Sequence, residues 1–135
     1  MPAQVAVSGI HHLALVVSDL ARAAAFYQEI LGFGPIIDMG SRVITSNGNT
    51  ILALTLPSRE GEKPQNDRFD ENRIGIDHLS FSVASLAALE NAVRVFDAQH
   101  IAHGEIKDLG PGLPIYVLAF RDPDNIQLEL TAPHG

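Results

Sequence analysis

The chain contains an internal repeat, and each copy carries a histidine at the same position. Residues 10–20 (IHHLALVVSDL) align with residues 76–86 (IDHLSFSVASL), and His12 falls on His78. Self-similarity of this kind indicates a duplicated supersecondary unit. Since the whole chain has only 135 residues, two such modules have to share one core. The repeat therefore predicts a single domain, residues 1–135, built from two similar halves.

A second match lies at the end of each copy. Residues 49–57 (NTILALTLP) align with residues 125–133 (NIQLELTAP), and Ala53 falls on Glu129. Two histidines and one carboxylate thus occupy matching points of a duplicated scaffold, while the fourth point is apolar. The pair of histidines indicates a metal site.

The apolar pattern predicts the same order of elements in both modules: a strand, a helix and three further strands. Module one covers about residues 8–57 and module two about residues 74–133. Residues 58–73 form a polar, charged linker between them, which could also close over a substrate. The predicted fold class is α+β, with two paired β-α-β-β-β modules that form a curved, concave mixed sheet and carry their helices on its outer face.

Individual boundaries follow from turn and capping residues. In module one we expect a strand over residues 9–17, Ser18 as the cap of the next helix, and Gly32 as its end. In module two the predicted elements are a helix from Ser85 to about Gln99, an edge strand near His103 to Lys107, and strands over residues 114–120 and 126–132.

Alternation along the strands predicts which side chains share a face. The more apolar set in each first strand should lie beneath the helices, which leaves His12, His78 and Glu129 on the concave face. If Phe120 pairs with Ile126 across the last turn, Ala119 lines this cavity and Tyr116 does not. The remaining residues predicted to line it are Ala14, Val16, Ile51, Ala53, Thr55, Ser80, Ser82, Ile115, Val117, Gln127 and Thr131.

Composition excludes several kinds of partner and site. The net charge of −7 argues against nucleic acid and anionic membranes. The absence of cysteine excludes disulfides, thiolate nucleophiles and thiolate metal ligands, so that a metal would be held by nitrogen and oxygen. Because the sequence shows neither a charged leader nor an apolar run of about 20 residues, a cytoplasmic location is expected.

The chain resembles the vicinal-oxygen-chelate superfamily of glyoxalases, extradiol dioxygenases, fosfomycin-resistance transferases, methylmalonyl-CoA epimerases and bleomycin-resistance proteins. The resemblance rests on His12 seven residues before Asp19, on His78 at the repeat position, and on residues 120–129 (FRDPDNIQLE). It implies metal ligands at His12, His78 and Glu129 for one divalent metal: Fe, Mn, Ni or Zn. It also implies a homodimer in which His12 serves with the histidine and glutamate of a partner chain.

Departures from the family pattern narrow the choice of activity. Val16 and Ala53 stand where glutathione-dependent glyoxalases carry an arginine and a fourth ligand. Ala14 stands where fosfomycin transferases carry a threonine, and Ala119 replaces a tyrosine of both those transferases and the extradiol dioxygenases. The set of two histidines and one glutamate still leaves open coordination positions for a chelating substrate.

Two functions follow as alternatives. The first is a metal-dependent enzyme, a dioxygenase or a glyoxalase-like lyase or isomerase, acting on a small oxygen-chelating substrate. In that case Glu129 is the catalytic residue, and we expect the substrate to be oriented by Thr55, Ser80, Ser82 and Gln127. The second is a metal-free small-molecule binding protein of the bleomycin-resistance type.

Overall fold

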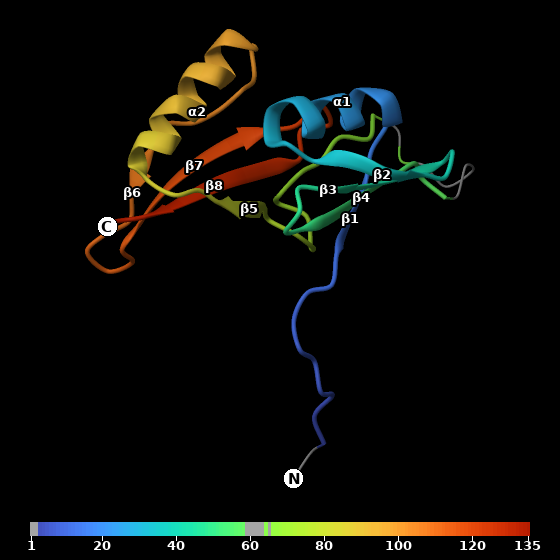
Figure 1. Ribbon diagram of the computed structural model, residues 1–135, viewed down its shortest axis with the longest axis horizontal. Helices are drawn as coiled ribbons and strands as arrows, with labels where there is room; N and C mark the ends of the chain where they lie inside the picture. Colours follow the sequence, from blue (N-terminus) through green and yellow to red (C-terminus); the bar gives the residue numbers. More distant parts are fainter. Residues whose placement is uncertain (1–2, 59–63, 65) are drawn as a thin grey trace. The chain divides into compact units, whose positions relative to one another are not determined.

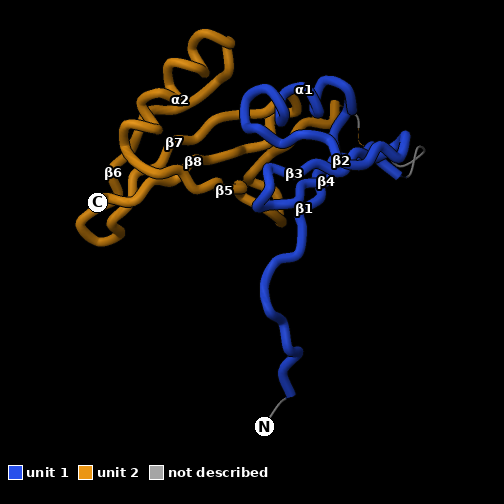
Figure 2. The backbone as a smooth tube through the Cα atoms, viewed as in Figure 1, with its two compact units in different colours: residues 1–63 blue, residues 64–135 orange. Residues whose placement is uncertain are grey.

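The computed structural model describes residues 3–58, 64 and 66–135, and the chain divides into two compact units, residues 1–63 and residues 64–135 (Figure 2). Each unit has the element order strand, helix and three strands (Figure 1). The predicted α+β class with two β-α-β-β-β modules is therefore confirmed. That the modules, about residues 8–57 and 74–133, form one domain stays a prediction.

Unit 1 holds a four-stranded mixed sheet with the strand order β1-β4-β3-β2. Strand β1 is parallel to β4, and the other neighbours are antiparallel. The β3–β4 connection is a tight turn in which the Asn47 side chain accepts hydrogen bonds from the backbone of Asn49 and Thr50. The elements of the unit are β1 (Leu13–Val16), α1 (Leu20–Leu31), β2 (Gly34–Asp38), β3 (Arg42–Ser46) and β4 (Ile51–Thr55).

Helix α1 begins one residue later than predicted. Its N-cap is Asp19, whose carboxylate accepts a hydrogen bond from the Arg22 backbone at 2.9 Å, so the expectation that Ser18 caps it was wrong. The ladder to β4 continues to Val17, whose N–H donates to Thr55 O. The chain is therefore still extended where Ser18 begins, and the Ser18 hydroxyl accepts from the Arg22 guanidinium instead. The predicted end at Gly32 is confirmed, with φ at 77°.

Unit 2 repeats the arrangement with the strand order β5-β8-β7-β6, in which β5 and β8 are parallel. Its helix begins after Ser85, as predicted, and Ser85 accepts a hydrogen bond from the Ala88 backbone. The elements of the unit are β5 (Leu79–Ser82), α2 (Leu86–Ala98), β6 (Lys107–Asp108), β7 (Ile115–Arg121) and β8 (Gln127–Pro133).

The predicted edge strand near His103 to Lys107 is shorter than expected. His103 forms an isolated bridge to Phe120, and the paired strand begins only at Lys107, which lies opposite Val117. The register shifts by one residue between these two pairings. An extra residue on the edge chain interrupts the ladder there, as in a β-bulge.

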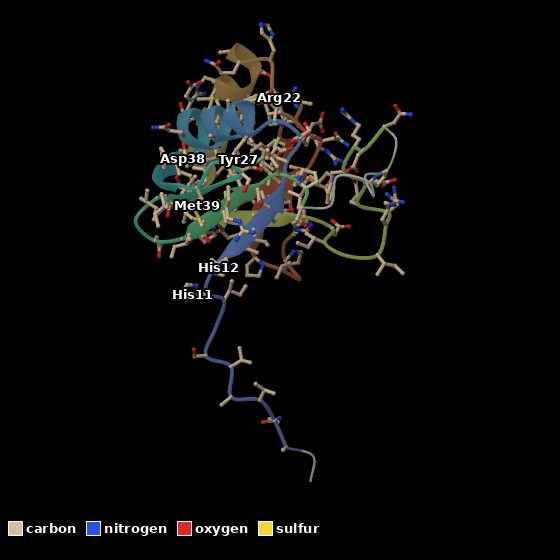
Figure 3. The ribbon with its side chains drawn as sticks, turned by 90° about the vertical axis from the view of Figure 1, so that its right-hand side faces the viewer. His11, His12, Arg22, Tyr27, Asp38 and Met39 are labelled. Carbon is tan, nitrogen blue, oxygen red and sulfur yellow. The ribbon has the colours of Figure 1, made fainter. Side chains whose placement is uncertain are left out.

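Each helix covers one face of its own sheet. Tyr27 of α1 is fully buried and points toward the sheet of unit 1 (Figure 3), where Leu52 and Leu54 are also fully buried. In unit 2, Phe96 of α2 stacks on Phe120 with ring centroids 4.5 Å apart. In β8, Leu128, Leu130 and Ala132 are buried, whereas Gln127, Glu129 and Thr131 are half-exposed. In each sheet the face beneath the helix is therefore buried, and the opposite face is more exposed except at positions such as Ala53 and Val117.

The segment that precedes β5 does not behave as a free linker throughout. Its residues 59–63 and 65 lie outside the described residues. Farther along, Phe69 N donates to Asp124 O, and the Asn125 amide donates to Phe69 O at 3.0 Å. Glu71 binds Arg121 through two hydrogen bonds. This part of the predicted linker is therefore packed against the β7–β8 turn of unit 2.

Two further features concern the ends and helices of the chain. The residues before β1 run away from the sheet of unit 1 (Figure 1), and Val5 and Val7 there are largely exposed. Among the described residues, no helix combines the length and the apolar character needed to span a membrane.

Candidate functional site

The parallel pairing of β5 with β8 brings the predicted site residues of unit 2 onto one open face. Ser80 lies opposite Glu129, and Ser82 lies opposite Thr131. His78 stands directly before β5, so its side chain follows the parity of Ser80. The sequence prediction that these residues share a face away from the helix is confirmed within this unit.

His78 and Glu129 approach each other closely. Nε2 of His78 lies 3.5 Å from Oε1 of Glu129, and the side chains are 39% and 19% exposed. Neighbouring ligands of a tetrahedral metal, each about 2.1 Å from it, lie about 3.4 Å apart. The two donor atoms therefore stand at the separation that a shared metal ion requires.

The other nitrogen of His78 is already engaged. Nδ1 lies 2.8 Å from Oδ1 of Asp77. Since a carboxylate oxygen accepts, Nδ1 carries the hydrogen, and in the neutral ring Nε2 then presents a lone pair. In this neutral form Nε2 and Oε1 of Glu129 face each other as two acceptors, whereas a protonated ring would donate from Nε2 to Oε1. A cation between them resolves this conflict, so the donor chemistry fits a metal.

Two hydroxyl groups, those of Thr131 and Ser80, extend the contacts from the same oxygen of Glu129. Thr131 Oγ1 donates to Glu129 Oε1 at 3.1 Å, and Ser80 Oγ lies 2.6 Å from Thr131 Oγ1. Because the single hydroxyl hydrogen of Thr131 goes to Glu129, Ser80 must donate to Thr131. The lone pairs of Ser80 then remain for a group that donates.

A second chain of contacts reaches His78 from the opposite side. The Gln127 amide nitrogen donates to both the backbone oxygen and Oδ1 of Asp77, each at 3.0 Å. Arg121 Nη2 contacts Gln127 Oε1 at 3.4 Å and binds Glu71. Through these hydrogen bonds the Arg121 guanidinium lowers the pKa of Glu71 to about 2. Of these residues the sequence prediction named only Gln127.

Strand β7 supplies the apolar part of the open face. Ala119 lies opposite Glu129, and Val117 lies opposite Thr131. Tyr116 has the other parity, as predicted, and its ring packs on His134 with centroids 4.6 Å apart. The expected pairing of Phe120 with Ile126 was wrong, because Phe120 pairs with Leu128. The actual register differs by an even number of residues, so the predicted faces are unaffected.

Unit 1 presents the corresponding positions of the first module. His12 precedes β1, and Ala14 and Val16 lie opposite Ala53 and Thr55 of β4. The Ala53 side chain is almost fully buried and offers no ligand. The Thr55 hydroxyl already donates to Leu56 O at 3.2 Å.

His12 has a close neighbour of its own. Its Nδ1 lies 2.9 Å from Nδ1 of His11, and both side chains stand at the entrance to β1 (Figure 3). His12 belongs to unit 1, whereas His78 and Glu129 belong to unit 2. In the described part of the chain no three His, Asp or Glu side chains come together as a metal-binding group. The three-ligand set therefore stays a prediction, of which the structure assembles two members.

The sequence analysis did not predict Asp77, Arg121 and Glu71 as site residues, and these three differ in whether the sequence carries a signal for them. Asp77 is adjacent to His78 in the sequence, and ligand histidines commonly donate a hydrogen bond to a carboxylate, so this residue could have been predicted. Arg121 lies inside the motif FRDPDN but carries no pattern that specifies its partner. Glu71 is 50 residues from Arg121 in a polar segment, where only the folded chain reveals the contact.

Comparison with known proteins agrees with this architecture. A family model described as the Glyoxalase/Bleomycin resistance protein/Dioxygenase superfamily matches residues 9–130. The metallothiol transferase FosB of Shouchella clausii is 29% identical over 92% of this chain and 80% of its own. The ethylmalonyl-CoA/methylmalonyl-CoA epimerase of Cereibacter sphaeroides is 27% identical over 90% of this chain and 95% of its own.

Solved structures show the same fold. The glyoxylase/bleomycin resistance protein/dioxygenase domain from Frankia sp. EAN1pec superimposes with a TM-score of 0.78 at 30% identity, over 95% of this chain and 93% of that one. With the family match over residues 9–130, the repeated β-α-β-β-β units and this likeness, the chain belongs to the Glyoxalase/Bleomycin resistance protein/Dioxygenase superfamily.

Proposed function

We propose that the protein is a metal-dependent enzyme that acts on a small oxygen-chelating substrate, as a dioxygenase or as a glyoxalase-like lyase or isomerase. The observation that carries this proposal is the His78 and Glu129 pair, whose Nε2 and Oε1 atoms, an imidazole nitrogen and a carboxylate oxygen, lie 3.5 Å apart. Two relatives named as enzymes, a metallothiol transferase and an epimerase, support the enzymatic class.

We propose His12 as the third ligand, from the same chain or from a partner chain. Two neutral imidazoles and one carboxylate suit a divalent metal, with Fe, Mn, Ni and Zn as the candidates. When bound, such a metal supplies Lewis-acid stabilisation of negative charge that develops on a substrate oxygen.

The protein groups around Glu129 have separate roles in this proposal. The Thr131 hydroxyl holds one orientation of the carboxylate, and Ser80 is fixed in turn by Thr131. Glu129 is the catalytic residue and accepts a proton from the substrate. Ser80 accepts a hydrogen bond from a substrate hydroxyl or amide, because its own hydrogen is directed to Thr131.

The apolar neighbours set the expected size and polarity of the substrate. Ala119 and Val117 share the face of the polar residues, where Ala119 is half-buried and Val117 is buried. The positive charge of the Arg121 guanidinium is paired with Glu71, so it does not favour a negatively charged substrate. Small, largely uncharged or aromatic substrates fit such a surface. Ser82 and Thr55 remain proposed orienting groups.

Metal analysis of protein purified without a chelating tag tests the proposal. The wild type should contain about one divalent metal per chain, and His78→Ala and Glu129→Ala should lose it. His100→Asn is the matched control, because His100 is an exposed histidine at φ 57°, a conformation that asparagine tolerates. A wild type that takes up no metal after anaerobic incubation with divalent ions would refute the enzyme and favour a metal-free binding protein of the bleomycin-resistance type.

We further propose a homodimer with shared sites. A mixed dimer of a His12→Ala chain and a His78→Ala chain distinguishes the two ligand arrangements. Sites shared between chains leave one intact site per mixed dimer, because the wild-type His12 of one chain meets the wild-type His78 of the other. Sites within one chain leave none, and metal content per dimer measures the difference. A cytoplasmic location also stays a prediction.

A further inference from the structure

The hydrogen bonds on the Nδ1 side of His78 form a chain that a simple ligand role does not require. Asp77 Oδ1 accepts from His78 Nδ1 at 2.8 Å and from the Gln127 amide at 3.0 Å. Gln127 also donates to the backbone oxygen of Asp77. Asp77 is therefore held at two points by one side chain while it contacts the imidazole.

We propose that Asp77 is a positioning residue for His78: it fixes the ring orientation and the tautomer in which Nε2 faces Glu129, and Gln127 fixes Asp77. A histidine that is 39% exposed has room to rotate about its side-chain bonds and to exchange its tautomers. A carboxylate on Nδ1 removes both freedoms, because only one tautomer donates to it.

Gln127 is placed to do this by the sheet. It is the first residue of β8, and continuing the parallel register of Leu79 with Leu128 by one residue places it opposite His78. Its amide nitrogen is occupied by Asp77, and its oxygen contacts Arg121 at 3.4 Å. In this proposal Gln127 serves the site by holding Asp77, and its predicted role in orienting the substrate stays a prediction.

Glu71 completes the chain from the segment before β5. Its carboxylate binds both terminal nitrogens of Arg121, at 2.9 and 2.7 Å, and Arg121 also donates to Asn125 O. This two-point contact fixes the plane of the guanidinium. The contact between Arg121 and Gln127, at 3.4 Å, is the longest of these hydrogen bonds. We therefore expect replacement of Asp77 to affect His78 most, replacement of Gln127 less, and replacement of Glu71 least.

The direct test is the tautomer of His78, read from the two imidazole nitrogen signals in long-range ¹H–¹⁵N NMR spectra of the metal-free protein at a pH where the ring is neutral. In the wild type Nδ1 should carry the hydrogen. In Asp77→Ala both tautomers should be populated, and Gln127→Ala should produce a smaller change. Asp77 is 68% exposed, so its removal leaves the core intact.

A matched control comes from another histidine and aspartate pair of this unit. His103 Nε2 lies 2.6 Å from Asp97. Asp97→Asn should change the signals of His103 and leave those of His78 unaltered. An unchanged His78 tautomer in Asp77→Ala would overturn the proposal.

The second readout is the affinity for Zn²⁺, measured by competition with a chelator, and this readout rests on the proposed metal function. Loss of a partner that orients a ligand histidine typically weakens metal binding about 10- to 100-fold, and we expect this for Asp77→Ala. An affinity within 2-fold of the wild type would refute the positioning role. If the wild type binds no Zn²⁺ but Asp77→Ala still changes the tautomer, the metal function fails and the positioning of His78 stands.

Discussion

Replacement of Phe120 by alanine tests the assignment of faces along β7, because adjacent residues of this strand have opposite environments. Phe120 is 1% exposed and stacks on Phe96. Phe→Ala substitutions in a core cost about 3–5 kcal/mol of unfolding free energy, of which the stacked pair accounts for about 0.5–1.5 kcal/mol. Since small proteins are stable by about 5–15 kcal/mol in total, the variant should be folded but close to its limit.

Urea unfolding with tyrosine fluorescence measures this loss in the unit concerned. The chain has two tyrosines, one in each unit, and no tryptophan. A Tyr27→Phe background therefore leaves Tyr116 as the reporter of unit 2. In this background Phe120→Ala should lower the urea midpoint at an unchanged slope. Ala119→Ser is the control: its side chain is on the open face, so stability should change by about 0.5 kcal/mol or less. A loss below about 1 kcal/mol for Phe120→Ala would refute the facial assignment.

Three further predictions concern local interactions. Arg121 lowers the pKa of Glu71 from 4.5 to about 2. The pair therefore stabilises the fold fully above pH 4.5, and this contribution is lost as the pH falls toward 2. In urea unfolding measured across this pH range, Glu71→Gln should remove that pH dependence. The Asp97 carboxylate and the Gly104 carbonyl raise the pKa of His103. The contribution of protonated His103 to the stability of the fold is therefore complete below pH 6.5 and disappears as the pH rises through the raised pKa. Asp97→Asn should make the stability less dependent on pH in this upper range. Asn125 has φ at 68°, so Asn125→Ala should cost about 1–2 kcal/mol in urea unfolding and Asn125→Gly less, and equal losses would show that the Phe69 contact dominates.

The repeat made most of the fold predictable. It specified the order of elements in both modules, and alternation correctly placed Glu129 and Ala119 on one face and Tyr116 on the other. The cap of α1 was missed because Ser18 and Asp19 are both good capping residues, and the choice depends on how far β1 continues along β4.

The candidate site was predictable only as far as local pattern reaches. His78 and Glu129 were identified from the repeat and the family resemblance, and the structure brings them together. The chain of contacts from Glu71 through Arg121 and Gln127 to Asp77 depends on residues about 50 positions apart. Contacts of this kind arise from tertiary packing, which neither periodicity nor spacing encodes.

The parallel pairing of β5 with β8 also has a kinetic consequence. These strands are joined through a helix and two other strands, and the paired residues Leu79 and Leu128 are 49 positions apart in the sequence. Because closing such long loops is slow, β5 should be among the last strands to pair in unit 2. During synthesis His78 is added to the chain 51 positions before Glu129. A metal ion can be captured by this pair only once the final strand has been added.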